Sequence, residues 1–164
     1  MRRGHAAAIV LLAAGVAAAA PAPAAKLDML GFFSGKTHAE NVLRIAMKRP
    51  ARLIVDSVGG KNKAGEFVLI DTVREEGKPV RERKWVMRPA GPNRFTGTLS
   101  DAVGPVDVTV AGARATIRYT MKGGLKVDQT LDLHPDGRTL LNQVTVRKFG
   151  LKFATVEGKV RKLD

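Results

Sequence analysis

Apolar and polar side chains alternate with a period of two through the stretch from Ala113 to Leu133. Successive side chains of a β-strand point to opposite faces, so each half of this stretch predicts a strand with one buried and one solvated face. Gly123-Gly124 separates the two halves. Because glycine adopts the positive φ of tight hairpin turns without steric cost, the pattern predicts an antiparallel hairpin here.

The rest of the chain repeats this pattern at short intervals. Strand-like runs are separated by glycine, proline, asparagine and aspartate, the residues that favour turns. The lead-in 26–35 is expected to form one helical turn that plugs an open end, or a loop that buries Phe32 and Phe33. We expect a bulge at Gly158. The further predicted strands are 43–47, 51–58, 66–74, 80–88, 95–99, 106–110, 140–146 and 151–162.

About eight to ten short strands without a long helix predict an all-β antiparallel fold, either a sandwich or a barrel. Sequential hairpin connections favour an up-and-down β-barrel, because closure leaves no exposed strand edge. Side chains either fill the interior of such a barrel or shape it into one small-ligand cavity. A transmembrane barrel would need longer strands and girdles of aromatic residues, whereas only 5% of these residues are aromatic.

Residues 1–24 have the features of a secretory signal peptide. A positively charged start is followed by an apolar, alanine-rich stretch and by the small-x-small cleavage pattern Ala22-Pro23-Ala24. The barrel domain is then 25–164, and we expect a periplasmic protein whose mature N-terminus is Ala25 or Lys26. The alternative is an uncleaved N-terminal anchor.

Charge and cysteine content narrow the class of protein. The chain has no cysteine, so the fold must be held without disulfides and has no lipid-modified N-terminal cysteine. The formal net charge is +13, and removal of the two leader arginines, Arg2 and Arg3, leaves +11. Such a basic protein attracts anionic lipid surfaces or acidic polysaccharides, although the same charge also serves as an ordinary solvated surface.

Candidates for catalysis are few. Beyond the predicted leader, the histidines are His38 and His134, and without cysteine they form no recognisable zinc site. There is no nucleophile-elbow serine, phosphate-binding loop or dinucleotide fingerprint. Asp128 and Asp132 are expected to form cross-strand ion pairs with basic residues of the preceding strand. We predict no catalytic residue, no metal and no cofactor.

Several polar residues share the parity of apolar neighbours, and these are the main candidates for a site. An unpaired buried polar group costs about 1–3 kcal/mol. Such residues therefore either bond one another as a structural network or orient a ligand in an apolar pocket. In a pocket, Arg83 would meet an anionic head group, and Arg83→Ala would weaken binding of an acidic amphiphile. The predicted ligand-binding residues are Arg83, Trp85, Met87, Tyr119, Gln129 and Asn142.

Basic residues are frequent in the last predicted strand, 151–162, and in the residues just before it. They are expected to face an anionic membrane or another polyanion, or to form an ordinary solvated edge. Nucleic-acid binding would need exposed aromatic platforms, whereas Trp85 and Tyr119 are predicted to point inward. The residues of this basic group are Arg147, Lys148, Lys152, Lys159, Arg161 and Lys162.

A series of short motifs resembles one bacterial family. The motifs are Phe32-Phe33-Ser34-Gly35, Arg83-Lys84-Trp85, Thr96-Gly97, the segment 100–104, Leu141-Asn142 and Lys148-Phe149-Gly150. In this order they resemble the domain of unknown function 3833 family of exported proteins. The resemblance implies a lipocalin-like (calycin-type) β-barrel at the cell envelope with no established activity, and it implies no catalytic residues.

These observations favour a non-enzymatic periplasmic barrel that binds a small hydrophobic or amphipathic molecule, with an anionic, lipid-like molecule as one candidate. One alternative is a cell-envelope interaction protein with a packed core that acts through its basic surface. Another is a hydrolase or isomerase built on the same barrel. An apolar interior cavity favours the first, a filled core the second, and converging carboxylates or histidine in a cleft the third.

Overall fold

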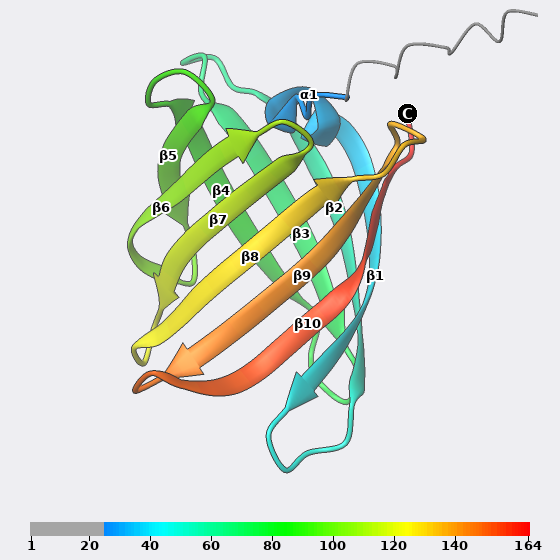
Figure 1. Cartoon of the computed structure of the whole chain (residues 1–164), viewed down its shortest axis with the longest axis vertical. Coiled ribbons are helices and arrows are strands. Elements are labelled where there is room, and N and C mark those ends of the chain that lie inside the picture. The colour runs from blue at the N-terminus through cyan, green and yellow to red at the C-terminus, as the bar shows by residue number, and fades with distance from the viewer. Residues whose placement is uncertain (1–24) are drawn as a thin grey trace, which may run out of the picture.

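The computed structural model describes residues 25–164, so the predicted signal peptide lies outside the described residues. Ten antiparallel strands and one short helix make up this part of the chain (Figure 1). The elements are α1 (Met29–Phe33), β1 (Gly35–Ile45), β2 (Ala51–Lys61), β3 (Phe67–Glu75), β4 (Arg81–Pro89), β5 (Arg94–Leu99), β6 (Ala102–Ala111), β7 (Arg114–Met121), β8 (Leu125–Leu133), β9 (Thr139–Lys148) and β10 (Leu151–Lys162).

Each strand pairs with its neighbours in sequence, and β1 also pairs with β10, which closes the sheet. This is the predicted up-and-down barrel, and closure removes the free strand edges that would otherwise pair with another chain. The hairpin between β7 and β8 is also confirmed: Gly123 and Gly124 have φ values of 84° and 74°. Such a turn matches the twist of the two strands and sets their register.

The alternating pattern places apolar side chains inside the barrel. In β7, Ala115, Ile117 and Tyr119 are buried, whereas Arg114 and Arg118 are exposed. Because the register pairs inward residues with inward residues, a mostly apolar lining runs around the closed sheet. Burial of this lining must stabilise the fold without disulfides, since the chain has no cysteine.

Helix α1 covers one end of the barrel, which we call the plugged end (Figure 1). Asp28 caps the helix by accepting a hydrogen bond from the Gly31 N–H at 3.0 Å. Its last two residues, Phe32 and Phe33, are buried, as expected for the lead-in. The helix sits close to β2 because Gly59 lacks a side chain: a Cβ there would lie 2.1 Å from the Phe33 carbonyl oxygen.

The structure corrects two details of the prediction. The first strand begins at Gly35, well before Leu43. The irregularity of β10 lies between Lys152 and Ala154, whereas Gly158 is in regular register with β1 and β9, so the predicted bulge at Gly158 was wrong. Within the described part of the chain, no helix has the length and apolar character that crossing a bilayer requires.

Candidate ligand-binding cavity

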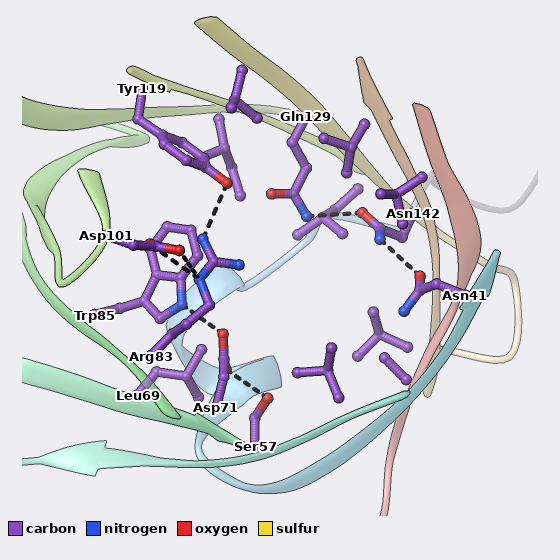
Figure 2. Close-up of a pocket in the computed structure, with 18 of the residues that line it drawn as sticks. Asn41, Ser57, Leu69, Asp71, Arg83, Trp85, Asp101, Tyr119, Gln129 and Asn142 are labelled. Carbon is purple, nitrogen blue, oxygen red and sulfur yellow. Dashed lines mark hydrogen bonds and ion pairs between the residues drawn. The ribbon is translucent and has the colours of Figure 1, made fainter. Parts of the chain in front are cut away.

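A cavity of about 300 Å³ occupies the middle of the barrel. Its wall is mostly apolar, with Ile117, Val127 and Leu131 among the residues on β7 and β8, and Phe33 of α1 contributes at the plugged end. Two groups of polar side chains interrupt this wall and face each other across the interior (Figure 2). The cavity therefore has the mixture of apolar surface and a few fixed polar groups that small-molecule sites use.

The first polar group is centred on the buried carboxylate of Asp71 in β3. Its Oδ1 accepts a hydrogen bond from the Ser57 hydroxyl at 2.8 Å, and its Oδ2 accepts one from the Trp85 indole N–H at 2.7 Å. Burial raises the pKa of Asp71 above its ordinary value, because these two hydrogen bonds and the nearby Arg83 only partly offset the loss of water. The carboxylate thereby fixes the indole ring of Trp85 in the cavity wall.

Arg83 of β4 lies next to this carboxylate and makes its own internal contacts. Its Nε is 3.0 Å from Oδ2 of Asp101, and its Nη2 donates to the Tyr119 hydroxyl at 3.2 Å. The guanidinium carbon stands 5.2 Å from the centre of the Trp85 ring, and Trp85 meets Tyr119 edge to face. Burial alone would lower the pKa of Arg83, but Tyr119 and Asp101 raise it, so the side chain is a paired cation.

The second polar group is a row of amides across four neighbouring strands. Gln129 donates from Nε2 to Oδ1 of Asn142 at 2.8 Å, and Asn142 donates from Nδ2 to Oδ1 of Asn41 at 2.9 Å. Asn41 ends the row by donating to the Leu53 carbonyl at 3.4 Å. The bond between Asn142 and Asn41 passes over β10 at Gly158, which pairs with both residues.

The cavity extends to the end of the barrel opposite α1, which we call the far end. The five connections there are 46–50, 76–80, 100–101, 122–124 and 149–150. Glu75 and Arg81 line the cavity near this end, with 3.9 Å between Oε2 and Nη2. Because the Arg81 side chain is 48% exposed, the lining reaches solvent at this end.

All six predicted ligand-binding residues line the cavity: Arg83, Trp85, Met87, Tyr119, Gln129 and Asn142. Five of them belong to the two polar groups, Arg83, Trp85 and Tyr119 to the first and Gln129 and Asn142 to the second, whereas Met87 adds apolar surface. Sequence reasoning missed Asn41, Ser57 and Asp101 as partners in these groups. For Asn41 and Ser57 the signal was their parity with the apolar residues Ala39 and Val55.

The basic residues near the C-terminus divide into several environments. Lys148, Lys152, Lys159 and Arg161 are exposed, whereas Arg147 pairs with Asp128 on β8 at 2.7 Å. The prediction for Lys162 was wrong. Its ammonium group donates to the carbonyl oxygens of Gly31, Phe32 and Ser34, so it holds the C-terminal end of α1 instead of facing outward.

Outside the barrel, the other candidate residues form ion pairs. Asp128 and Asp132 pair with Arg118 and Arg114 at 3.2 and 2.6 Å, which confirms the predicted cross-strand pairs. Within residues 25–164 there is no group of three or more acidic or histidine side chains that could hold a metal ion.

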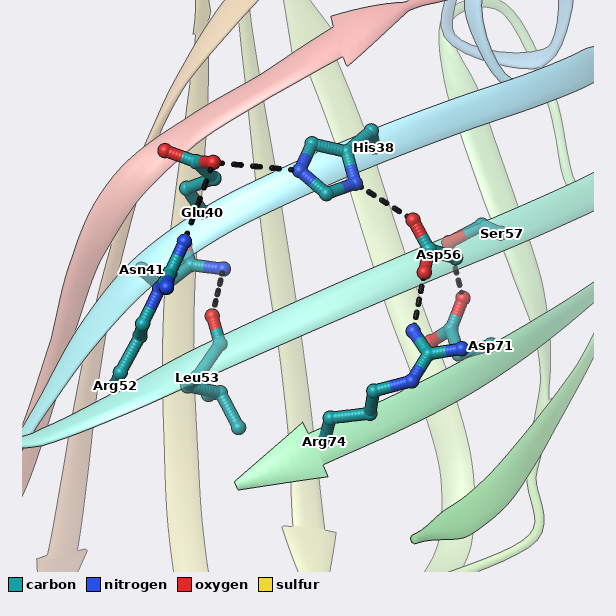
Figure 3. A network of polar contacts seen from close by, with 9 residues as sticks. All are labelled: His38, Glu40, Asn41, Arg52, Leu53, Asp56, Ser57, Asp71 and Arg74. Carbon is teal, nitrogen blue, oxygen red and sulfur yellow. Dashed lines mark hydrogen bonds and ion pairs between the residues drawn. The ribbon is translucent and has the colours of Figure 1, made fainter. Parts of the chain in front are cut away.

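His38 lies in a network of charged side chains on the outer face of β1, β2 and β3 (Figure 3). Its Nδ1 is 2.6 Å from Oδ1 of Asp56, and its Nε2 is 3.5 Å from Oε1 of Glu40. The hydrogen bond with Asp56 raises the pKa of His38, although partial burial opposes this effect. Arg74 contacts the other oxygen of Asp56, and Arg52 lies 3.6 Å from Oε1 of Glu40, so the network is a chain of surface ion pairs.

The sequence matches one protein family, and the fold matches several solved structures. Residues 14–162 match the family model described as "Protein of unknown function (DUF3833)". A search of curated protein sequences gives no match. The sequence resemblance to this family is therefore confirmed by the family model.

Solved structures share the fold at low sequence identity. The S-type phycobiliprotein lyase CPES from Guillardia theta has a TM-score of 0.65 at 6% identity, over 82% of this chain and 90% of that one. Rv2717c from M. tuberculosis has a TM-score of 0.58 at 13% identity, over 82% and 95% of the two chains. A protein of the DUF3598 family from Nostoc punctiforme gives 0.57 at 10% identity, over 88% of this chain and 53% of that one. The barrel is thus lipocalin-like, as expected.

Proposed function

The chain belongs to the DUF3833 family of proteins of unknown function, and we propose that its barrel binds a small hydrophobic or amphipathic molecule. The observation that carries this proposal is the cavity of about 300 Å³ inside a closed, lipocalin-like barrel. Apolar cavities of about half this volume already bind small aromatic molecules. The cavity is thus large enough for the apolar body of a small ligand.

The polar groups of the lining favour a ligand with a hydrogen-bonding head group. Arg83 uses Nε and Nη2 for Asp101 and Tyr119, and a guanidinium carries five N–H donors, so others are left for a ligand. Because Asp101 already balances the charge of Arg83, an anionic head group must compete with that carboxylate. We therefore propose an uncharged polar head group ahead of an anionic one.

We infer binding without catalysis, and the two carboxylates beside Arg83 support this because both already have protein partners. Asp71 accepts hydrogen bonds from Ser57 and Trp85 on its two oxygens, and Asp101 pairs with Arg83. A general base needs a lone pair within reach of a substrate proton. In a binding protein, Asp71 and Asp101 would keep these partners and fix the shape of the cavity wall.

We also propose that the protein acts in the periplasm. The support is the leader pattern of residues 1–24. Mass spectrometry of the protein from fractionated cells tests this: the expected mature N-terminus is Ala25 or Lys26. Recovery of the full precursor in the exported fraction would contradict the proposal.

Trp85 provides a direct test of binding, because it is the single tryptophan of the chain and lines the cavity. We expect dodecanol and anilinonaphthalene sulfonate to change its emission in a saturable way. Val144→Phe places a ring in the cavity and should weaken both titrations at least about tenfold, which corresponds to roughly 1.4 kcal/mol.

The matched control is Gln143→Phe, which adds the same ring to the exposed neighbouring position of β9. This variant should bind both probes as the unmodified protein does. Equal weakening by the two variants, or no saturable change of Trp85 emission in the unmodified protein, would refute binding in the cavity.

A further inference from the structure

Six large apolar side chains are exposed around the far end of the barrel, and we call them the apolar rim. Met47 and Phe149 stand at hairpin tips, where they are fully and 92% exposed, and Leu151 is 75% exposed. The hairpins that carry these residues project from the end opposite α1 (Figure 1). The members of the apolar rim are Met47, Val80, Val103, Phe149, Leu151 and Phe153.

The backbone at two of these positions indicates that the side chains are not there for the fold. Met47 and Phe149 have positive φ values of 62° and 52°, where asparagine or glycine would be less strained. Phe149 precedes Gly150 in a two-residue turn in which both φ values are positive. A bulky apolar residue in a strained, solvent-exposed position contributes nothing to the core, so a role outside the folded chain is the better explanation.

The connections at the two ends differ in charge. At the far end the connections carry Lys48, Arg49, Lys78 and Lys122 against Glu76 and Asp101, and Asp101 is already paired with Arg83. Two more cations, Lys148 and Lys152, flank the Phe149 turn. At the plugged end, the connections 62–66, 90–93, 112–113 and 134–138 carry equal numbers of basic and acidic side chains. The far-end connections therefore carry a net charge of 4 − 2 = +2, those of the plugged end are neutral, and the apolar rim lies among the positively charged connections.

We propose that the far end docks on the surface of an anionic lipid bilayer, with the apolar rim in the head-group region and the surrounding lysines and arginines on lipid phosphates. Apolar side chains bordered by cations are the combination that binds such interfaces. A protein interface is a poorer fit, because lysine is depleted from the centres of protein interfaces. Docking in this orientation turns the solvent-reaching end of the cavity toward the lipid.

The test is co-sedimentation of the purified protein with vesicles, with its N-terminus established by mass spectrometry. We expect binding to phosphatidylcholine vesicles that contain phosphatidylglycerol, weaker binding to pure phosphatidylcholine, and release as salt increases. Replacing Met47 and Phe149 together by asparagine should weaken binding at least about tenfold, while the turns keep a residue that tolerates positive φ. Lys148→Gln and Lys152→Gln should each weaken it by about fivefold.

Leu163→Asn is the matched control, since Leu163 is a 58% exposed apolar residue at the other end. It should leave vesicle binding unchanged. No vesicle binding by the unmodified protein, salt-independent binding, or equal losses in the control and rim variants would overturn the proposal. Met47 and Phe149 do not line the cavity, so these variants should still bind dodecanol with the same change in Trp85 emission. Docking and ligand binding can therefore fail separately.

Discussion

Gly158 gives the sharpest test of how the interior is built. It lies in β10 between Asn41 of β1 and Asn142 of β9, and its missing side chain leaves room for their amides to meet. In Gly158→Ala, the new Cβ would lie 2.1 Å from the Glu40 carbonyl oxygen and 2.5 Å from Oδ1 of Asn41. Since the first of these atoms is backbone, the strand pair must separate to accept the methyl group.

Two effects set the size of the loss. Insertion of a methyl group into a tightly packed site typically costs about 1–3 kcal/mol. Displacement of the Asn41 side chain also breaks its bond with Asn142 and leaves buried amide groups without a partner, at about 1–3 kcal/mol. Because relaxation of the strands relieves part of both, we expect a loss of about 3 kcal/mol in the free energy of unfolding.

The assay is urea unfolding followed by the emission of Trp85. Gly60→Ala is the control, because Gly60 lies in β2 with no atom within 4 Å of an added Cβ and without positive φ. It should change the free energy of unfolding by no more than about 0.5 kcal/mol. A Gly158→Ala protein within that same margin would refute the role of Gly158 as the gap through which the amides bond.

Three further substitutions test the polar interior. Thr37→Val should stabilise the protein by about 1 kcal/mol in thermal unfolding, because the buried Thr37 hydroxyl has no partner among the described residues. Burial raises the pKa of Asp71 above 3.8, so the unmodified protein loses stability as pH rises through the folded-state pKa of this group. Asp71→Asn does not titrate, so its free energy of unfolding should rise relative to that of the unmodified protein over the same pH interval, measured by urea unfolding. Asp101→Asn removes the charge opposite Arg83 and should favour dodecanoate over dodecanol in Trp85 titrations; an unchanged ratio would argue against contact between the head group and Arg83.

The strand pattern was predictable wherever inward positions are consistently apolar. The hairpin of β7 and β8 is such a case, because Ala115, Ile117, Val127 and Leu131 alternate with charged or hydroxyl side chains. The start of β1 was missed because Thr37 and Asn41 take inward positions there. Polar residues at buried positions remove the period-two signal that identifies a strand.

The site could be predicted only as a set of inward residues. Parity shows that Arg83, Tyr119 and Asn142 point to the interior, but parity does not tell which strands face each other across a closed sheet. Asp101 lies outside any strand, so no alternation could assign it as the partner of Arg83. Lys162 was misassigned for a related reason: its partners are carbonyl groups of a helix more than a hundred residues earlier in the chain, which leave no mark in local sequence.

The cavity itself follows from strand number and side-chain size taken together. The interior of an eight-stranded barrel is about wide enough for side chains to fill, and ten strands enclose a wider space. This chain has one tryptophan, one tyrosine and six phenylalanines, and Phe149 lies outside the barrel. Part of the wall is made of smaller residues such as Ala39 and Val127, and amides that bond one another cannot collapse inward. Closure by hydrogen bonds therefore fixes a perimeter that these side chains do not fill, and the space left over is the proposed binding site.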